Sequence, residues 1–235
     1  VGLIGSIAIY INEEKIEDTD RTTPESIEIQ KNLAMMVDKK VDVVIIEVSS
    51  QAMKLDRVAG CEFDVGLFTN LTEDHISAKE HPTMEDYFNC KLELLKISKH
   101  AVINNDDETV RKVKDLLPNK DIRTFSIDNQ SDFKVNPTNI KITDSNIDFS
   151  IMFNGKEEKI EACIPGRFSV YNASGAIAVS SYFDVTADEI RQALKTLKVL
   201  GRSELVDNKL GLTIMIDYAH TPSSLESILT AVKSY

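Results

Sequence analysis

The feature of this sequence that most limits its fold is a run of apolar residues that ends in polar side chains. Residues 41–48 read VDVVIIEV and are rich in β-branched residues. Such a run is typical of a parallel strand in the centre of a sheet, buried on both faces. Glu47, Ser49 and Ser50 stand at its carboxyl end. We therefore expect a strand that carries polar side chains to one edge of a sheet.

A second apolar run, at residues 65–71, ends in the same way, because Asn70 closes it and His75 follows it. In open α/β sheets, ligands bind outside the carboxyl ends of the strands. Two neighbouring strands would bring Glu47 and His75 to one crevice. The sequence thus predicts a site at this edge of the sheet.

A helix is predicted to begin after Thr83, which is a candidate N-cap with Asp86 three residues further on. Its apolar face at helical spacing consists of Met84, Tyr87, Phe88 and Leu95. Lys91 falls on this same face. The stem of Lys91 either lies along the core while its ammonium group reaches water, or the group points into the site towards Glu47.

Another helix is predicted from Pro24, with Thr23 before it and a core face of Ile29, Leu33, Met36 and Val37. Thr22 and Thr23 have two interpretations. They either cap this helix, or they present hydroxyl groups to an anion or a sugar oxygen.

Downstream, strands at residues 101–105 and 122–127 flank a helix at residues 107–117, which continues a β-α-β alternation typical of a parallel sheet. Residues 133–164 alternate apolar and polar positions around Asn154-Gly155, which predicts a small antiparallel sheet. Pro118 is expected to end the helix at residues 107–117. The remaining elements are expected to be a helix at residues 165–183, whose small residues suggest close packing, a helix at 186–197 with Thr186 and Glu189 as a capping box, a strand at 212–217 and a helix at 223–235. We place a domain boundary near residues 199–204.

The composition excludes several classes of protein. The 235 residues carry a formal net charge of −11, which argues against nonspecific binding to nucleic acid or anionic lipid. No apolar run of membrane-spanning length and no signal peptide is present, so we expect a cytoplasmic protein without a membrane span. Cys61, Cys90 and Cys163 lack the spacing of a disulfide framework or a metal site.

The two ends of the chain predict that it is a fragment. Residues 1–7 enter at once as a strand-like run, and the sequence contains no G-x-x-x-x-G-K-[ST] phosphate loop. The last helix, at residues 223–235, has no partner strand after it. We expect segments of the natural protein on both sides.

Glu47, His75 and Lys91 are an unusual trio for a structural core. Glu and His side chains both bind divalent cations, although His is a poorer ligand for Mg²⁺ than for Zn²⁺. A neutral lysine amine can react with CO₂ to form a carbamate, an anion that can hold a metal. From these residues alone, a metal site is one possibility among others.

Six motifs in register closely resemble the Mur ligases, and among them the UDP-N-acetylmuramoyl-tripeptide synthetase branch. The motifs are E-V-S-S (47–50), F-T-N-L-T-E-D-H (68–75), C-K (90–91), P-G-R-F-S-V-Y-N (165–172), G-R-S-E (201–204) and D-Y-A-H-T-P (217–222). The resemblance covers essentially the whole chain. It implies an α/β fold: a mostly parallel sheet flanked by helices in a P-loop-type central domain, a small antiparallel sheet, and the start of a C-terminal α/β domain.

The resemblance implies an ATP-dependent ligase of peptidoglycan synthesis. Such an enzyme phosphorylates the terminal carboxylate of UDP-N-acetylmuramoyl-L-alanyl-D-glutamate, and the amine of a third amino acid then attacks the acyl phosphate. Mg²⁺ neutralises the crowded oxygens during transfer. A monomer is expected, with residues 1–200 as the central ATP-binding domain and 201–235 as the start of the C-terminal domain. Without the P-loop segment, this piece alone is expected to be inactive.

The resemblance also assigns residues. Glu47 and His75 match magnesium ligands, and Lys91 matches the lysine that is carbamylated in the family, so all three are expected to be catalytic. Positions that hold the UDP-muramoyl-dipeptide are Thr22, Thr23, Ser49 and Arg57. Positions around ATP are Asn70, Asn172, Arg202, Asp217, Tyr218 and His220.

The sequence departs from the family at Gln51, where a histidine is usual, and at Arg21, where an asparagine is usual. These two differences affect expected contacts with the substrate. The sequence of this chain does not identify the third amino acid that the enzyme would add. Two other classes stay open. One is a different amide ligase with the same central domain, such as cyanophycin synthetase or folylpolyglutamate synthase, and the other is a non-catalytic module that binds a nucleotide or UDP-sugar.

Overall fold

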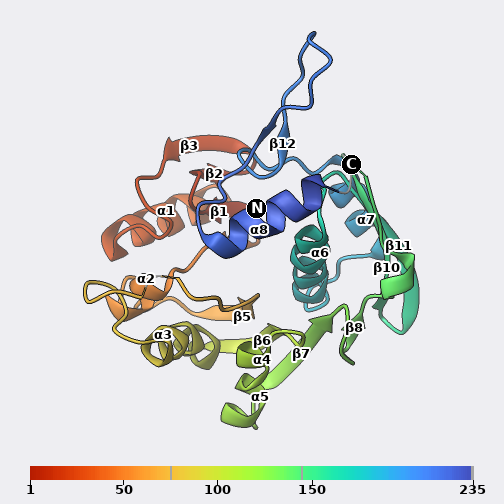
Figure 1. The fold of residues 1–235 in the computed structure, drawn as a ribbon. Coiled ribbons are helices and arrows are strands. Elements are labelled where there is room, and N and C mark those ends of the chain that lie inside the picture. Colours follow the sequence, from red (N-terminus) through yellow and green to blue (C-terminus); the bar gives the residue numbers. More distant parts are fainter. Residues whose placement is uncertain (75, 144, 234–235) are drawn as a thin grey trace. The chain divides into compact units, whose positions relative to one another are not determined.

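A computed structural model describes residues 1–74, 76–143 and 145–233 (Figure 1). The described residues form two compact units. Of the described residues, the first unit contains 1–64 and 76–98, and the second contains 65–74, 99–143 and 145–233. Each unit has its own sheet, and each is described below by itself.

The first unit is built on a four-stranded sheet with the order β3-β2-β1-β4. Its strands are β1 (Gly2–Ile4), β2 (Ala8–Ile11), β3 (Glu14–Asp18) and β4 (Val44–Ile46). β1 is antiparallel to β2 and parallel to β4. The β2–β3 turn has Asn12 and Glu13 at positive φ. The sequence pattern did not predict this hairpin, because the turn lacks glycine and β3 is mostly exposed.

The prediction of a central strand buried on both faces at residues 41–48 was wrong. Only Val44–Ile46 forms a strand, and among the described strands it pairs with β1 alone. Ile45 is 55% exposed as a result. An apolar run shows only that a segment has few polar side chains. Whether both faces of the strand are covered depends on how many strands lie beside it.

Helix α1 (Ser26–Asp38) begins two residues later than Pro24, so that start was wrong. Glu25 is the N-cap, and its N–H donates to the Glu28 carboxylate at 3.0 Å. The inner face carries Ile29, Asn32 and Met36, whereas Val37 is 74% exposed. Thr23 does not cap the helix, because its hydroxyl bonds the backbone of the segment after β4.

Helices α2 (Ser50–Lys54) and α3 (Met84–Ile97) pack against each other in the first unit. The predicted N-cap of α3 is confirmed, since Thr83 Oγ1 accepts the Asp86 N–H at 3.1 Å. The buried face of α3 consists of Tyr87, Phe88, Leu92 and Leu95. Lys91 lies beside this face and is half-buried.

The second unit contains the other four-stranded sheet, with the order β5-β6-β7-β8. Its strands are β5 (Phe63–Phe68), β6 (Ser98–Asn104), β7 (Asp121–Ser126) and β8 (Phe133–Lys134). β6, β7 and β8 run parallel, so the expected parallel sheet is confirmed here. Residues 133–134 join this sheet and not the antiparallel sheet in which we had predicted them.

One helix was predicted at residues 107–117, but the structure has two short ones, α4 (Glu108–Arg111) and α5 (Val113–Leu116). The N–H of Lys112 bonds Thr109 O, which is a tighter i→i+3 contact than α-helical geometry uses. The break therefore falls at Lys112, ahead of the proline that we expected to end a single helix.

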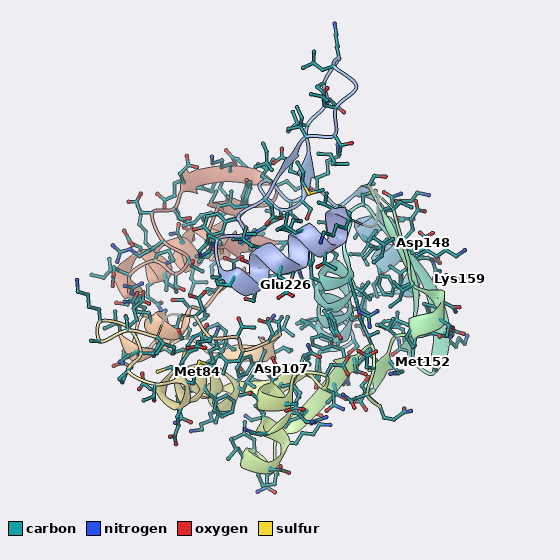
Figure 2. The ribbon with its side chains drawn as sticks, in the orientation of Figure 1. Met84, Asp107, Asp148, Met152, Lys159 and Glu226 are labelled. Carbon is teal, nitrogen blue, oxygen red and sulfur yellow. The ribbon has the colours of Figure 1, made fainter. Side chains whose placement is uncertain are left out.

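The small antiparallel sheet is confirmed, with strands β9 (Lys141–Ile142), β10 (Ile147–Phe153) and β11 (Lys156–Ala162) after a 3₁₀ turn, η1 (Pro137–Asn139). Asn154 and Gly155 make the β10–β11 turn with φ of 49° and 77°, as a two-residue turn of type I′ requires. Asp148 and Lys159 lie on the exposed side of this sheet (Figure 2).

Helices α6 (Arg167–Ser180) and α7 (Ala187–Thr196) complete the core of the second unit, α6 against β7 and β10, and α7 against β11 (Figure 1). A Cβ on Gly175 would lie 3.3 Å from the Phe125 ring, so α6 approaches β7 closely, as its small residues predicted. Thr186 and Glu189 form the predicted capping box of α7.

The C-terminal part of the chain forms the antiparallel pair β12 (Glu204–Leu205) and β13 (Met215–Ile216), followed by α8 (Pro222–Val232). The strand predicted at 212–217 is thus shorter than expected. The boundary near residues 199–204 stays a prediction. Within the described residues, no helix is both long and apolar enough to cross a membrane.

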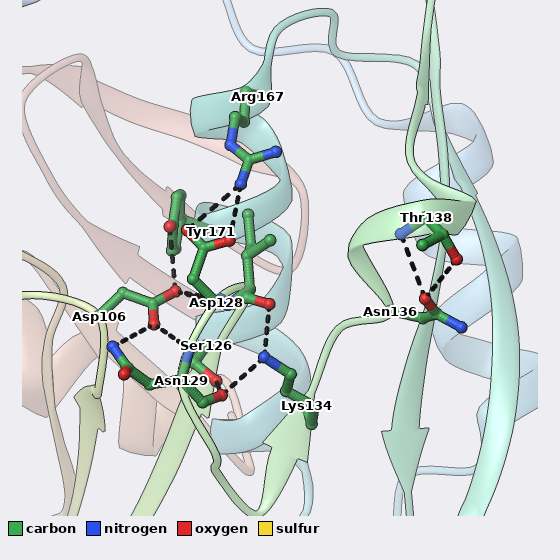
Figure 3. A network of polar contacts seen from close by, with 10 residues as sticks. Asp106, Ser126, Asp128, Asn129, Lys134, Asn136, Thr138, Arg167 and Tyr171 are labelled. Carbon is green, nitrogen blue, oxygen red and sulfur yellow. Dashed lines mark hydrogen bonds and ion pairs between the residues drawn. The ribbon is translucent and has the colours of Figure 1, made fainter.

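A half-buried acidic side chain joins the end of β6, the loop after β7 and α6 (Figure 3). Asp106 accepts the backbone N–H groups of Ile127, Asp128 and Asn129 at 2.6 to 2.9 Å, and the Tyr171 hydroxyl at 3.0 Å. Burial acts to raise the pKa of the Asp106 carboxyl, but these hydrogen bonds together hold it below its ordinary value. Burial and the Asp106 charge raise the pKa of Tyr171.

We predict that Asp106→Asn lowers the free energy of unfolding at pH 7 by about 1–3 kcal/mol, since an amide cannot accept all these donors. A lowered folded-state pKa stabilises the protein above the ordinary Asp pKa of about 3.9, and this contribution is lost as the pH falls through the folded-state value. Urea unfolding from pH 7 to pH 3 should show the two proteins converging. Asp128→Asn, at a more exposed ion pair with Arg167, should change stability by less than about 0.5 kcal/mol.

The core of the second unit gives another prediction. Phe125 is fully buried among β7, β10 and α6, so Phe125→Ala should cost about 3–5 kcal/mol by loss of apolar burial and formation of a cavity. Phe183→Ala is the matched control, because Phe183 is 38% exposed. Equal losses for the two variants in chemical denaturation would contradict this placement of the core.

Candidate functional site

The first unit contains a pocket of about 260 Å³, and all of its lining residues belong to that unit. It lies where the segment before α1, the N-terminus of α2 and the inner face of α3 meet. The lining residues are Arg21, Thr22, Thr23, Ser49, Ser50, Gln51, Arg57, Glu80, His81, Tyr87 and Lys91. Five of these are residues that the sequence predicted for the site: Thr22, Thr23, Ser49, Arg57 and Lys91.

Thr23 holds the pocket wall together. Its hydroxyl donates to Glu47 O at 2.9 Å and accepts the Ser49 N–H at 2.9 Å, and Thr23 is only 1% exposed. These two bonds tie the segment before α1 to the end of β4. The capping interpretation of Thr23 is therefore replaced by a structural role in the wall of the pocket.

Arg57 is a buried cation on this wall, with 8% of its surface exposed. Nη1 donates to Thr23 O at 3.0 Å, and Nη2 lies 3.2 Å from the Glu25 carboxylate. The Nε atom is buried and, among the described residues, has no hydrogen-bond partner. A buried N–H without an acceptor is costly, so this arginine is held in the wall at the expense of one unpaired donor.

Lys91 extends from α3 into the lining of the pocket. Its Nζ lies 5.1 Å from the centre of the Tyr87 ring, within cation–π range. Two interpretations of Lys91 were open: a stem that only covers the core, or a side chain directed into a site. Its position in the pocket lining agrees better with the second.

Glu47 lies beside the pocket and not in its lining. Its Oε2 accepts the Ser6 N–H at 2.8 Å and the Ser6 hydroxyl at 2.5 Å, and a Cβ on Gly5 would lie 3.1 Å from the carboxyl carbon. The carboxylate is thus held in one orientation. His75 lies outside the described residues, so the convergence of Glu47, His75 and Lys91 stays a prediction.

Four of the residues predicted for ATP gather in the second unit. The Arg202 guanidinium lies 4.9 Å from the centre of the Tyr218 ring. The centres of the Tyr218 and His220 rings are 4.9 Å apart, and the two rings pack edge to face. Asp217 accepts the N–H groups of Ser203 at 2.7 Å and Ala219 at 2.8 Å. The loop before β12 and the loop after β13 are therefore joined.

Asn70 and Asn172 lie elsewhere in the second unit. Asn70 follows β5 and donates to Thr69 Oγ1 at 3.4 Å, and Asn172 is exposed on α6. Among the described contacts, none joins either residue to Arg202 or Asp217.

Sequence reasoning missed a buried hydrogen-bonded chain in the wall of the pocket. His81 is fully buried, and its Nδ1 and Nε2 bond Asp86 Oδ2 at 2.7 Å and Ser50 Oγ at 2.9 Å. Lys54 Nζ lies 3.0 Å from the same Asp86 oxygen. No periodicity could have found this chain, because His81 lies in an irregular loop.

A pocket of hydroxyl groups and cations beside the carboxyl end of a parallel strand is typical of α/β proteins that bind small anionic ligands. A family model described as the Mur ligase middle domain matches residues 1–180. The chain therefore belongs to the Mur ligase family.

Individual relatives agree with this assignment. A UDP-N-acetylmuramoyl-L-alanyl-D-glutamate–2,6-diaminopimelate ligase of Clostridium botulinum is 42% identical over all of this chain and 48% of its own length. The ligase of the same name from Clostridium perfringens is 40% identical, with the same coverage. A solved ligase of that name superimposes with a TM-score of 0.82 at 23% identity, over 99% of this chain and 47% of the other. The chain thus spans about half the length of the curated relatives it matches.

We predict that Thr23→Val lowers the free energy of unfolding by about 1–3 kcal/mol, because it leaves the Glu47 carbonyl and the Ser49 N–H unpaired. Valine has almost the same shape as threonine, so packing should change little. Thr22→Val is the control, since Thr22 is half-buried and accepts one bond, from Ser6 Oγ at 3.1 Å. Calorimetry that shows no greater loss for Thr23→Val than for Thr22→Val would contradict the role given to Thr23.

Proposed function

We propose that this chain supplies the central part of an ATP-dependent ligase that adds the third amino acid to UDP-N-acetylmuramoyl-L-alanyl-D-glutamate in peptidoglycan synthesis. The observation that carries the proposal is the pocket of the first unit, which gathers Thr22, Thr23, Ser49, Arg57 and Lys91. Arg57 in the lining supports a ligand with oxygen atoms at this wall, since a guanidinium group suits a carboxylate.

The charge of the pocket fits the proposed substrate. Apart from Lys91, which we propose to be a carbamate, Arg21 and Arg57 contribute two cations to the lining, against one carboxylate, Glu80. The chain as a whole carries −11. A local excess of positive charge on an acidic protein favours a small anion such as a peptidyl carboxylate.

We propose that the enzyme works with Mg²⁺ held by Glu47, His75 and Lys91, the last as its carbamate. The Glu47 carboxylate is exposed and fixed by Ser6, and a carboxylate oxygen is the kind of ligand that Mg²⁺ prefers. When bound, the metal neutralises charge on the phosphate and carboxylate oxygens. Ser6 then acts by holding Glu47 in the orientation that binding requires.

The proposed reaction has two steps. The substrate carboxylate attacks the γ-phosphorus of ATP, and ADP leaves, which gives an acyl phosphate. The amine of the third amino acid then attacks the acyl carbon, and phosphate leaves with formation of the amide bond. The residues of the chain act by positioning, since phosphoryl transfer depends mainly on orientation and charge.

We assign the ATP contacts to Asn70, Asn172, Arg202, Asp217, Tyr218 and His220. The contacts among the last four support a common role, since the Arg202 guanidinium and the His220 ring both contact the Tyr218 ring. The proposal places the enzyme in the cytoplasm as a monomer. The names of the relatives make 2,6-diaminopimelate the first amino acid to test.

The test uses this chain within a polypeptide of the relatives' full length. Phosphate release and product formation are measured with UDP-N-acetylmuramoyl-L-alanyl-D-glutamate, ATP and, in turn, diaminopimelate, lysine and ornithine. Ligation of one of these amino acids supports the proposal. Failure with all of them, in a folded protein that binds ATP, would contradict it.

In the same polypeptide, Lys91→Ala should lower kcat by at least about 100-fold, because the carbamate charge that helps hold the metal is lost. Short carboxylic acids should restore part of the activity. Lys96→Ala is the matched control, since Lys96 is exposed in the last turn of the same helix and pairs with Glu93. A Lys91→Ala protein with normal turnover would contradict the role given to Lys91.

A further inference from the structure

Ser50, His81 and Asp86 form an ordered chain of hydrogen bonds that ends at the pocket. Asp86 Oδ2 lies 2.7 Å from His81 Nδ1, and His81 Nε2 lies 2.9 Å from Ser50 Oγ. His81 is fully buried and Ser50 is 6% exposed, and both line the pocket. The Tyr87 ring packs against the imidazole, with 5.0 Å between ring centres. Neither His81 nor Asp86 has a role in the function proposed above.

The direction of these bonds follows from the chemistry of the groups. Hydrogen bonds from His81 and from Lys54 lower the pKa of the Asp86 carboxyl, so it is an ionised acceptor. The proton of a neutral imidazole therefore sits on Nδ1, facing Asp86, and Nε2 is an acceptor. The Ser50 O–H consequently donates to Nε2. What Ser50 Oγ can still offer to the pocket is a lone pair.

A metal site is the competing explanation, since Cys90 lies close enough for its sulfur to join His81 and Asp86 within 4.8 Å. Two observations disfavour it. The Lys54 ammonium group lies 3.0 Å from the Asp86 oxygen and donates to Glu80 O at 2.8 Å. The Asp86 carboxylate is therefore already paired with a cation, and a metal ion would have to displace it. Both nitrogens of His81 are also engaged with protein groups.

We propose that Asp86 and His81 orient Ser50 so that Ser50 Oγ accepts a hydrogen bond from a peptide amide N–H of the bound ligand. Asp86 and His81 are positioning residues, and Ser50 makes the contact. This inference rests on the proposed function for the identity of the ligand. It adds a specificity element, because an oxygen that offers only lone pairs repels a carboxylate and selects a donor.

The surroundings of Ser50 explain why a donor is needed at this point. Arg21 and Arg57 line the same pocket and attract the oxygens of an anionic ligand. A fixed acceptor beside two arginine side chains fits a ligand in which carboxylates and an amide N–H lie close together. The amide that joins alanine to the terminal glutamate has this arrangement.

The experiment compares two ligands in the full-length polypeptide: UDP-N-acetylmuramoyl-L-alanyl-D-glutamate, and its analogue with an ester oxygen in place of the alanyl–glutamyl N–H. We expect the wild type to bind the amide about 5- to 10-fold tighter than the ester in calorimetric titration. Ser50→Ala should reduce this ratio to about twofold or less. Ser98→Ala is the matched control, because Ser98 is equally buried but lies at the end of α3 and outside the lining of the pocket.

A second measurement tests the positioning chain without any ligand. In ¹⁵N NMR of histidine-labelled protein, His81 should show the tautomer protonated at Nδ1, and Ser50→Ala should shift the Nε2 resonance. Asp86→Ala should change the tautomer population and lower the amide-to-ester ratio. Lys96→Ala, in the exposed last turn of the same helix, should change neither.

The outcomes are distinct. An amide-to-ester ratio that Ser50→Ala leaves unchanged, or a His81 protonated at Nε2, would overturn the inference while the proposed function stands. A wild-type protein that binds neither ligand would overturn the proposed function and the assignment of the ligand together. The NMR result would then still decide the direction of the hydrogen bonds.

Discussion

The hydroxyl of Thr23 is the interaction on which the pocket depends. With one donated and one accepted bond, it fixes two peptide groups at the end of β4 against the segment that leads into α1. Ser49, Ser50 and Arg57 are positioned from this junction, since Ser49 caps α2 and Arg57 donates to Thr23 O. Through its buried hydroxyl and its backbone carbonyl, Thr23 thus connects the segment before α1 to residues 47–49 and to Arg57.

Burial fixes the polar side chains of the pocket in place, which suits them to recognise a ligand. Arg57, Ser50 and His81 are each less than 9% exposed, and each already has a protein partner. Held in this way, they lose little further freedom when a ligand arrives. Lys91 and Glu47 are more exposed, which suits groups that we propose to bind a hydrated cation and reacting oxygens.

Local sequence patterns predicted the elements whose signals are local. Thr83 caps α3 and the Thr186–Glu189 pair caps α7, because a capping bond spans only three residues. Asn154-Gly155 makes its turn because both residues tolerate positive φ. The β2–β3 hairpin and the exposed face of β4 escaped prediction, since both depend on which strands become neighbours.

For the site, the sequence by itself determined the family, through motifs in register, and with it five residues that line one pocket. Only the tertiary structure decided how these residues are held: Thr23 in the pocket wall and not at a helix cap, Arg57 with a buried Nε, and Ser50 bonded to His81. The reason is physical. A motif records the types of residue and their order, whereas hydrogen bonds between residues 23, 49, 50 and 81 exist only once folding brings distant segments within about 3 Å of one another.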